Sequence, residues 1–204
     1  NTFKKSTKKN IKKYNNSGLS RPFIIKNIIK KINNKTKIIS TTGYTSRELN
    51  QIRNENKQSI GRDFYMVGGM GHASMVALGC SLKTSKEVLC LDGDGSLIMH
   101  MGSLISSGMK AKSNFKHILF NNSSHESVDG QKIDTKKIKI KDIIKGFGYK
   151  KYYKCSSLNS FKKHINSFLK SKGPSFFEIK IKEGFLLNLS RPKNLKKIKK
   201  LFLN

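Results

Sequence analysis

The chain has 204 residues, of which 36% are hydrophobic, and this is enough for one domain with a buried core. Lys and Arg number 42 against 12 Asp and Glu, so the formal net charge is +30. Because the excess is mostly Lys spread along the whole chain and Arg is scarce, we interpret it as the compositional bias of an A/T-rich coding sequence and not as a sign of nucleic-acid binding. Such a charge would still attract anionic substrates and an acidic partner subunit.

The polar and basic residues 1–20 are expected to form a leader or linker, followed by one folded domain over residues 21–187. Residues 188–204 are expected to form a basic C-terminal tail. Apolar residues recur in this tail at the spacing of a short amphipathic helix: Leu195, Ile198, Leu201 and Phe202.

Within the domain, segments with helical periodicity alternate with short apolar segments typical of strands. A first helix is expected over 21–32, with Pro22 in its first turn, and a second has capping-box spacing if Thr45 is its N-cap. Further helices are expected at 72–82, 97–109, 138–146 and 158–170. Strands are expected at 37–40, 63–67, 87–91, 117–120, 149–153 and 175–181, and a loop over 121–135.

This alternation predicts an α/β fold, a doubly wound parallel sheet with helices on both faces. Segment 87–91 is apolar without alternation, as expected for a strand covered on both faces. In such sheets ligands bind beyond the carboxyl ends of the strands. Glycine-rich turns follow three of the predicted strands there, at Gly43, 68–71 and 93–95.

Two of these strand ends have residues that suit a magnesium and diphosphate site. Gly93-Asp94-Gly95-Ser96 follows one predicted strand, and Asn121-Asn122 follows the next. Mg²⁺ takes oxygen ligands and commonly bridges a carboxylate to phosphate groups, so Asp94 would supply charge and an Asn side chain a neutral ligand. The glycines allow close backbone approach, and the following helix directs free N–H groups at phosphates. Gly-Asp-Gly alone is also an ordinary strand-to-helix turn.

The Gly-Asp-Gly and Asn-Asn pair resembles the signature of thiamine-diphosphate enzymes. Longer motifs resemble the phosphonopyruvate decarboxylase family in particular, to which sulfopyruvate decarboxylases are closely related. These motifs are TTGYTSREL at 41–49, VGGMGHAS at 67–74, LDGDGSLIMHMG at 91–102, NNSSHESVDGQ at 121–131 and SRP at 190–192. The resemblance covers about residues 21–200 and implies the thiamine-diphosphate-binding fold, with this chain as the diphosphate-binding domain.

The resemblance implies that thiamine diphosphate and Mg²⁺ are the cofactors. Asp94, the side chain of Asn122 and the backbone carbonyl of Ser124 would bind Mg²⁺. The residues implied for the diphosphate are Gly93, Gly95 and Ser96, with Asn122 beside them.

The resemblance also implies roles for the glycine-rich turn and the loop after the metal site. The carbonyl of Gly68, next to Gly69, would accept a hydrogen bond from the 4′-amino group of the cofactor. Met70 would press between the two cofactor rings, although Met is also a common gap filler in protein cores. His125 and Glu126 are candidates for substrate binding or acid–base catalysis, the alternative being a solvated loop.

Other polar residues near the motifs have less distinct roles. Arg47 and Arg191 are candidates for a clamp on an anionic substrate, or they form surface ion pairs. His72 and His100 are expected to cap or pack. Asp129 stands where the family usually has Gly, which puts the backbone path of its loop in question.

Catalysis in this family needs a second domain, whose Glu protonates the aminopyrimidine of the cofactor. The sequence shows no second α/β unit before residue 21, so we expect a pyrimidine-binding subunit or domain to carry that Glu and the site to form in an oligomer. The implied substrate is a small anionic 2-oxo acid. In the favoured case phosphonopyruvate loses CO₂ to give phosphonoacetaldehyde, and the thiazolium ring accepts the electrons released.

Two other interpretations stay open. The chain would be the beta subunit of a sulfopyruvate decarboxylase if the substrate is a sulfonate. Alternatively, it would be a basic nucleic-acid-binding or scaffold protein on a decayed enzyme fold, which would need Lys clustered on one face beside aromatic residues.

The cysteines and the apolar segments indicate the compartment. Cys80, Cys90 and Cys155 are odd in number and form no CxxC pair, so a disulfide framework or a zinc site is not expected. No apolar run reaches bilayer length, and the first residues lack the apolar stretch of a signal peptide. We therefore expect a cytoplasmic protein without membrane contact.

Overall fold

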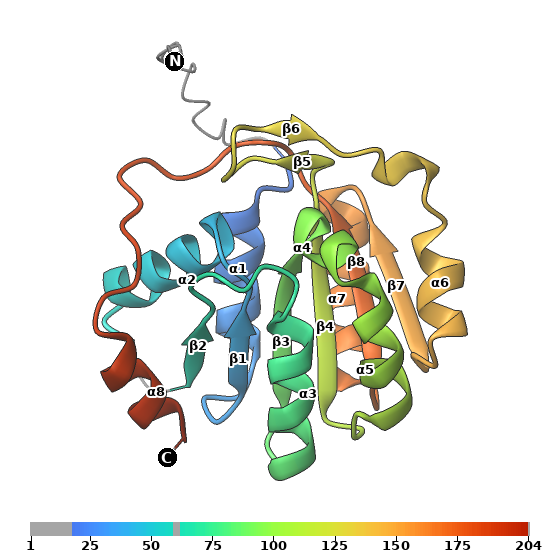
Figure 1. Cartoon of the computed structure of the whole chain (residues 1–204), viewed down its shortest axis with the longest axis horizontal. Coiled ribbons are helices and arrows are strands. Elements are labelled where there is room, and N and C mark those ends of the chain that lie inside the picture. The colour runs from blue at the N-terminus through green and yellow to red at the C-terminus, as the bar shows by residue number, and fades with distance from the viewer. Residues whose placement is uncertain (1–17, 59–61, 204) are drawn as a thin grey trace, which may run out of the picture.

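The structure is a computed structural model that describes residues 18–58 and 62–203. Six parallel strands form the main sheet in the order β2-β1-β3-β4-β8-β7 (Figure 1). Their bounds are β1 Lys37–Ser40, β2 Asp63–Tyr65, β3 Val88–Gly93, β4 Phe115–Asn121, β7 Lys151–Cys155 and β8 Ser175–Lys180. β5 Ser124–His125 and β6 Gln131–Lys132 form a short antiparallel ribbon within the expected loop.

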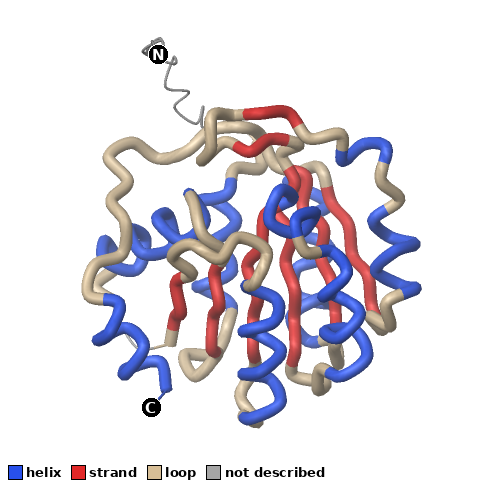
Figure 2. The backbone as a smooth tube through the Cα atoms, viewed as in Figure 1, coloured by secondary structure: helices blue, strands red, loops and turns tan. Residues whose placement is uncertain are grey.

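Helices cover both faces of the sheet, which confirms the predicted doubly wound α/β fold (Figure 2). On one face lie α1 Arg21–Lys31, α2 Tyr44–Glu55 and α7 Leu158–Lys170. On the other lie α3 Ala73–Lys83, α4 Asp94–Met99, α5 Leu104–Lys110 and α6 Ile140–Gly146. Each face has its own hydrophobic core, which is why β3 and β4 are buried along almost their whole length.

The chain reverses its direction across the sheet between β1 and β3. From β1 it crosses to the edge strand β2, returns to β3 on the other side of β1, and continues to β4. In open α/β sheets the crevice at such a reversal is the usual ligand site. The strands β1 and β3 that flank it end at Ser40 and Gly93, and the next strand, β4, ends at Asn121.

The second helix begins differently from the prediction. Its N-cap is Gly43, which has a φ of 87° and makes no side-chain cap, and Thr45 is buried within the first turn. The expected capping box does not form, because Glu48 makes its hydrogen bonds to Arg21 and to the backbone N–H of Leu186.

The helix expected over 97–109 is divided in two. α4 starts directly at Asp94, and after a 3₁₀ turn at Met101–Ser103 the chain continues as α5. His100 interrupts the helix with φ −134° and ψ 40°, and its ring lies edge-on 4.3 Å from the ring of His72. The two histidines therefore pack against each other, as expected from the sequence.

The C-terminal segment belongs to the packed domain. α8 Leu195–Leu203 lies beside the edge strand β2, where Ile198 joins the core on one face of the sheet and Phe202 the core on the other (Figure 1). Phe202 also packs 5.5 Å from Phe64. The expected amphipathic helix is present, but residue 187 does not divide a core from a separate tail.

The sequence also predicted an N-terminal leader and a protein without membrane contact. Residues 1–17 of the expected leader lie outside the described residues, whereas Leu19 is buried and Ser20 caps α1. Within 18–58 and 62–203, no helix has both the length and the apolar character that a membrane crossing requires.

Candidate metal and diphosphate site

A small cavity of about 60 Å³ lies at the carboxyl ends of β1, β3 and β4. It brings together most of the residues that the sequence singles out: Met70, Gly93, Asp94, Gly95, Ser96, Asn122, Ser124, His125 and Glu126. Arg21, which the sequence does not single out, also lines it. Gly68 lines a neighbouring cavity of about 260 Å³ that shares Met70, and Gly69 lines neither of these two.

Asp94 is a buried carboxylate at the start of α4. Its Oδ1 accepts a hydrogen bond from the N–H of Gly95 at 2.9 Å, and its Oδ2 accepts one from the N–H of Ser123 at 2.5 Å. Ser123 reaches this position with a φ of 56°, a conformation that non-glycine residues adopt at a cost. Burial raises the pKa of Asp94, and the two N–H donors act in the opposite direction.

The donor set around Asp94 fits a hard divalent cation. Among the described residues no cationic side chain forms an ion pair with this carboxylate, although it is only 3% exposed. Arg21 acts electrostatically on this carboxylate, but a buried charge without a directly paired counter-ion is costly, and a bound cation would supply that counter-charge. Asn122 and Ser124 line the same cavity and could offer neutral oxygen atoms to such a cation.

The two asparagines of the Asn-Asn motif point in different directions. Asn121 donates from Nδ2 to Glu178 at 3.0 Å and accepts from the hydroxyl of Thr135 at 3.0 Å, so it supports the neighbouring strand β8. Asn122 faces the cavity, and its Oδ1 accepts from the N–H of Ser124 at 3.1 Å. The geometry thus favours Asn122 over Asn121 as a candidate ligand, as the family resemblance implies.

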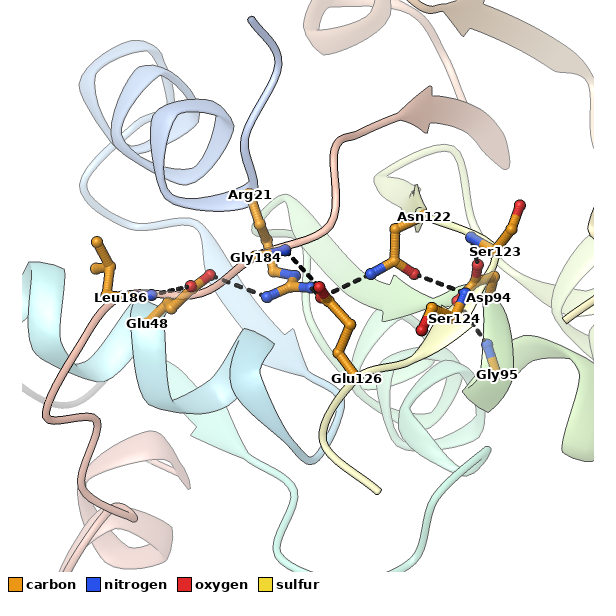
Figure 3. Close-up of polar contacts among 10 residues, drawn as sticks. All are labelled: Arg21, Glu48, Asp94, Gly95, Asn122, Ser123, Ser124, Glu126, Gly184 and Leu186. Atoms are coloured by element: carbon orange, nitrogen blue, oxygen red, sulfur yellow. Dashed lines mark hydrogen bonds and ion pairs between the residues drawn. The ribbon is translucent and has the colours of Figure 1, made fainter. Parts of the chain in front are cut away.

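A buried network of one arginine and two glutamates lies behind Asn122 (Figure 3). Arg21 contacts Glu126 Oε2 at 2.8 Å and Glu48 Oε2 at 3.2 Å. The backbone N–H of Gly184 donates to Glu126 Oε1, and that of Leu186 donates to Glu48 Oε1 at 3.1 Å.

Burial has the largest effect on the pKa of Glu48 in this network. The Glu48 side chain is fully buried, and this raises its pKa, while the Arg21 guanidinium and the N–H of Leu186 act in the opposite direction. Glu126, expected from the sequence to be a candidate catalytic group, has both carboxylate oxygens engaged in hydrogen bonds.

Arg21 is a residue of the cavity that sequence reasoning missed. It stands in the first turn of α1, where the helix dipole disfavours a positive charge. This local conflict was the available signal, since such exceptions often mark residues held by tertiary contacts.

Ser96 and His125 line the same cavity as Asp94. Ser96 Oγ accepts from Thr41 Oγ1 at 2.9 Å and from the N–H of Gly71 at 3.0 Å. The His125 ring lies directly over Gly95, because a Cβ at Gly95 would come 2.1 Å from His125 Cε1. The ring thus fills the space on the side of Gly95 where a Cβ would project.

The turn between β2 and α3 requires its glycines. Gly68, Gly69 and Gly71 have φ values of 71°, 56° and 90°, which side chains with a Cβ rarely adopt. This turn places Met70 in the wall between the two cavities.

The remaining candidates lie around the second cavity or its loop. Arg47 and Arg191 both line the cavity that contains Gly68, and the Arg47 guanidinium also lies 5.6 Å from the Tyr44 ring centre. Asp129 adopts a φ of 64°, so the loop follows a backbone path that a glycine would also take.

Comparisons with known proteins show which sequences and structures this chain resembles. The sequence profile described as "Thiamine pyrophosphate enzyme, C-terminal TPP binding domain" matches residues 41–179. The chain is 35% identical over 156 residues to a phosphonopyruvate decarboxylase of Streptomyces viridochromogenes, covering 76% of this chain but 38% of that protein. It is 35% identical over 147 residues to the sulfopyruvate decarboxylase subunit beta of Methanocaldococcus jannaschii, covering 72% of this chain and 75% of that subunit.

A solved structure has the same fold. The crystal structure of benzoylformate decarboxylase from Polynucleobacter necessarius superposes with a TM-score of 0.68 at 17% identity, over 82% of this chain and 34% of that one. The fold is thus shared with a chain about three times as long as the matched part.

Proposed function

This chain belongs to the thiamine pyrophosphate enzymes through their C-terminal TPP-binding domain, and from this we propose that it forms the diphosphate- and metal-binding half of a 2-oxo-acid decarboxylase. The preferred substrate in this proposal is phosphonopyruvate, which would yield phosphonoacetaldehyde and CO₂. When bound, thiamine diphosphate would supply the electron sink for the pair left behind by CO₂.

The observation that carries the proposal is the buried Asp94 carboxylate opposite Asn122. In the proposal Asp94, the Asn122 side chain and the Ser124 backbone hold Mg²⁺, which neutralises the diphosphate. Gly93, Gly95 and Ser96 line the same cavity and would orient the phosphate oxygens. These residues bind and orient, and none of them exchanges a proton with the substrate.

The anionic substrate is supported by charge around the second cavity. Arg47 and Arg191 line this cavity, next to Met70, and none of the acidic residues that the structure describes lines it. In the proposal one of them binds the phosphonate of the substrate. The net charge of +30 would add long-range attraction for such an anion, which weakens as salt increases.

A second candidate substrate is sulfopyruvate. The chain is as similar in identity to a sulfopyruvate decarboxylase beta subunit as to a phosphonopyruvate decarboxylase, and it spans most of that subunit. The Ser190-Arg191-Pro192 motif is the reason that we rank phosphonopyruvate first.

The proposal requires a pyrimidine-binding domain from a subunit or from another part of the protein. The two glutamates near the site, Glu48 and Glu126, are already bound by Arg21 and by backbone N–H groups, so neither is suited to activate the cofactor. We therefore place the activating Glu on that other domain, at an interface with the cavity of this chain.

Two experiments test the proposal. Calorimetry should detect thiamine diphosphate binding that depends on Mg²⁺ and is lost in Asp94→Asn but kept in Asp134→Asn, a control at an exposed carboxylate that pairs with Lys137. With a pyrimidine-binding partner co-expressed, CO₂ release from phosphonopyruvate should exceed that from sulfopyruvate. Magnesium-independent binding, or unchanged binding in Asp94→Asn, would refute the site, whereas the reverse substrate order would refute only the substrate.

A further inference from the structure

The Asn122 side chain can act as a metal ligand in only one of its two amide orientations. The oxygen of an amide accepts or coordinates, whereas its nitrogen carries two hydrogens and does neither. Something in the protein must therefore decide which end of this amide faces Asp94.

Glu126 fixes the orientation of the Asn122 amide in the structure. Its Oε2 accepts a hydrogen bond from Asn122 Nδ2 at 2.7 Å. A carboxylate can only accept hydrogen bonds, so it binds the amide nitrogen at this position and repels the amide oxygen. Figure 3 shows the consequence, with the nitrogen of Asn122 directed at Glu126 and its oxygen toward Ser124 and Asp94.

Arg21 and the backbone hold Glu126 in place. The guanidinium donates to the same Oε2 at 2.8 Å, and the N–H of Gly184 donates to Oε1, so rotation of the carboxylate would break both contacts. Arg21 is itself anchored by Glu48, whose side chain is completely buried. The chain of contacts thus runs from the interior to the amide of Asn122.

We infer that Glu126 is a positioning residue, held by Arg21, that orients the Asn122 amide so that its oxygen faces the metal site. This inference rests on the proposed function, because it needs a metal at Asp94. It assigns Glu126 no part in proton transfer to the substrate. Partners behind a metal ligand typically change metal affinity by about 10–100-fold when they are removed.

Glu126→Gln is the most direct test. The new amide would place an N–H₂ group opposite either Asn122 and Arg21 or Gly184, which are all donors, so the orientation of Asn122 would then be favoured only by the N–H of Ser124. The readout is the affinity for Mn²⁺, a paramagnetic substitute for Mg²⁺, from the electron paramagnetic resonance signal of the free ion with thiamine diphosphate present. We expect the affinity to fall about tenfold or more.

A double-mutant cycle separates this role from a general structural one. If Glu126 acts through Asn122, then Glu126→Gln changes Mn²⁺ affinity by less than about twofold in an Asn122→Ala background. Glu183→Gln, which removes a carboxylate from the more exposed ion pair with Lys132, is the matched control and should leave the affinity unchanged. All variants are compared at a temperature below their melting transitions.

The outcomes distinguish the inference from its premise. If Asp94→Asn abolishes Mn²⁺ binding but Glu126→Gln alone leaves it unchanged, the positioning role is refuted and the metal site stands. Equal losses for Glu126→Gln with and without Asn122 would also refute the role, because the effect would then be independent of the amide. If Asp94→Asn leaves Mn²⁺ binding intact, the metal site and the positioning role both fall.

Discussion

Replacing Arg21 with Met should destabilise the protein strongly at neutral pH. The substitution keeps much of the side-chain volume but removes the charge that Glu48 and Glu126 share. The side chains of Arg21, Glu48 and Glu126 are 6%, 0% and 10% exposed, so water cannot replace the lost partner. Breaking one partner of a buried ion pair costs about 3–5 kcal/mol. For a domain of this size that corresponds to a fall in melting temperature of roughly 6–20 °C.

The sign of the pH dependence follows from Glu48. Burial raises its pKa above the ordinary value of 4.5, so its contribution to stability is fully present below that value and is lost as the pH rises through the raised pKa. Without Arg21 the pKa rises further, because the main opposing charge is gone. The stability difference between the wild type and Arg21→Met should therefore be smallest near pH 4.5 and grow toward pH 8.

Urea denaturation between pH 4.5 and pH 8 measures this difference. Lys132→Met is the control, because it breaks a partly exposed ion pair with Glu183 and should cost about 1 kcal/mol or less. Adding Glu48→Gln to Arg21→Met should recover part of the loss, since it removes the uncompensated charge. A loss under about 1 kcal/mol for Arg21→Met, or one that does not vary with pH, would refute this account.

Three further predictions concern packing, thiol chemistry and the cavity. Gly108→Ala should lose about 1–3 kcal/mol in urea denaturation, because its Cβ would come 1.9 Å from the backbone oxygen of Phe147; an unchanged midpoint contradicts this. Burial raises the pKa of the Cys155 thiol to about 12, so about one thiol in 10⁴ is ionised at pH 8 and the folded protein should resist alkylation there by iodoacetamide. Mass spectrometry measures the alkylation, and a rate equal to that of the urea-unfolded protein would disprove the burial. His125→Ala should bind thiamine diphosphate at least as tightly by calorimetry, since no ring then covers Gly95, and tenfold weaker binding would indicate that the ring contributes contacts.

The features that the sequence predicted are those that depend on local patterns. Asp94 and Asn122 could be found because each directly follows a recognisable strand, and parallel strands bring such ends together. The glycine turn at 68–71 could be found because its backbone excludes other residues. The fold class followed from the alternation of periodic segments and is confirmed, while the ligand roles of these residues stay predictions.

The features that were missed depend on contacts between distant segments. Arg21 meets Glu126 across 105 positions of the chain, and no periodicity connects the two. The cap at Gly43 replaced that at Thr45 because the glycine can adopt a φ of 87°. The break at His100 follows from its packing on His72, which depends on how α3 and α4 meet.

The packing of α8 restricts how this protein can assemble. The outermost strand β2 is only three residues long and is flanked by α8, which reaches the cores on both faces. The opposite outermost strand, β7, carries exposed lysines at Lys151 and Lys154, which discourage pairing with another strand. Both features disfavour the addition of a strand from a neighbouring molecule at the edges of this sheet.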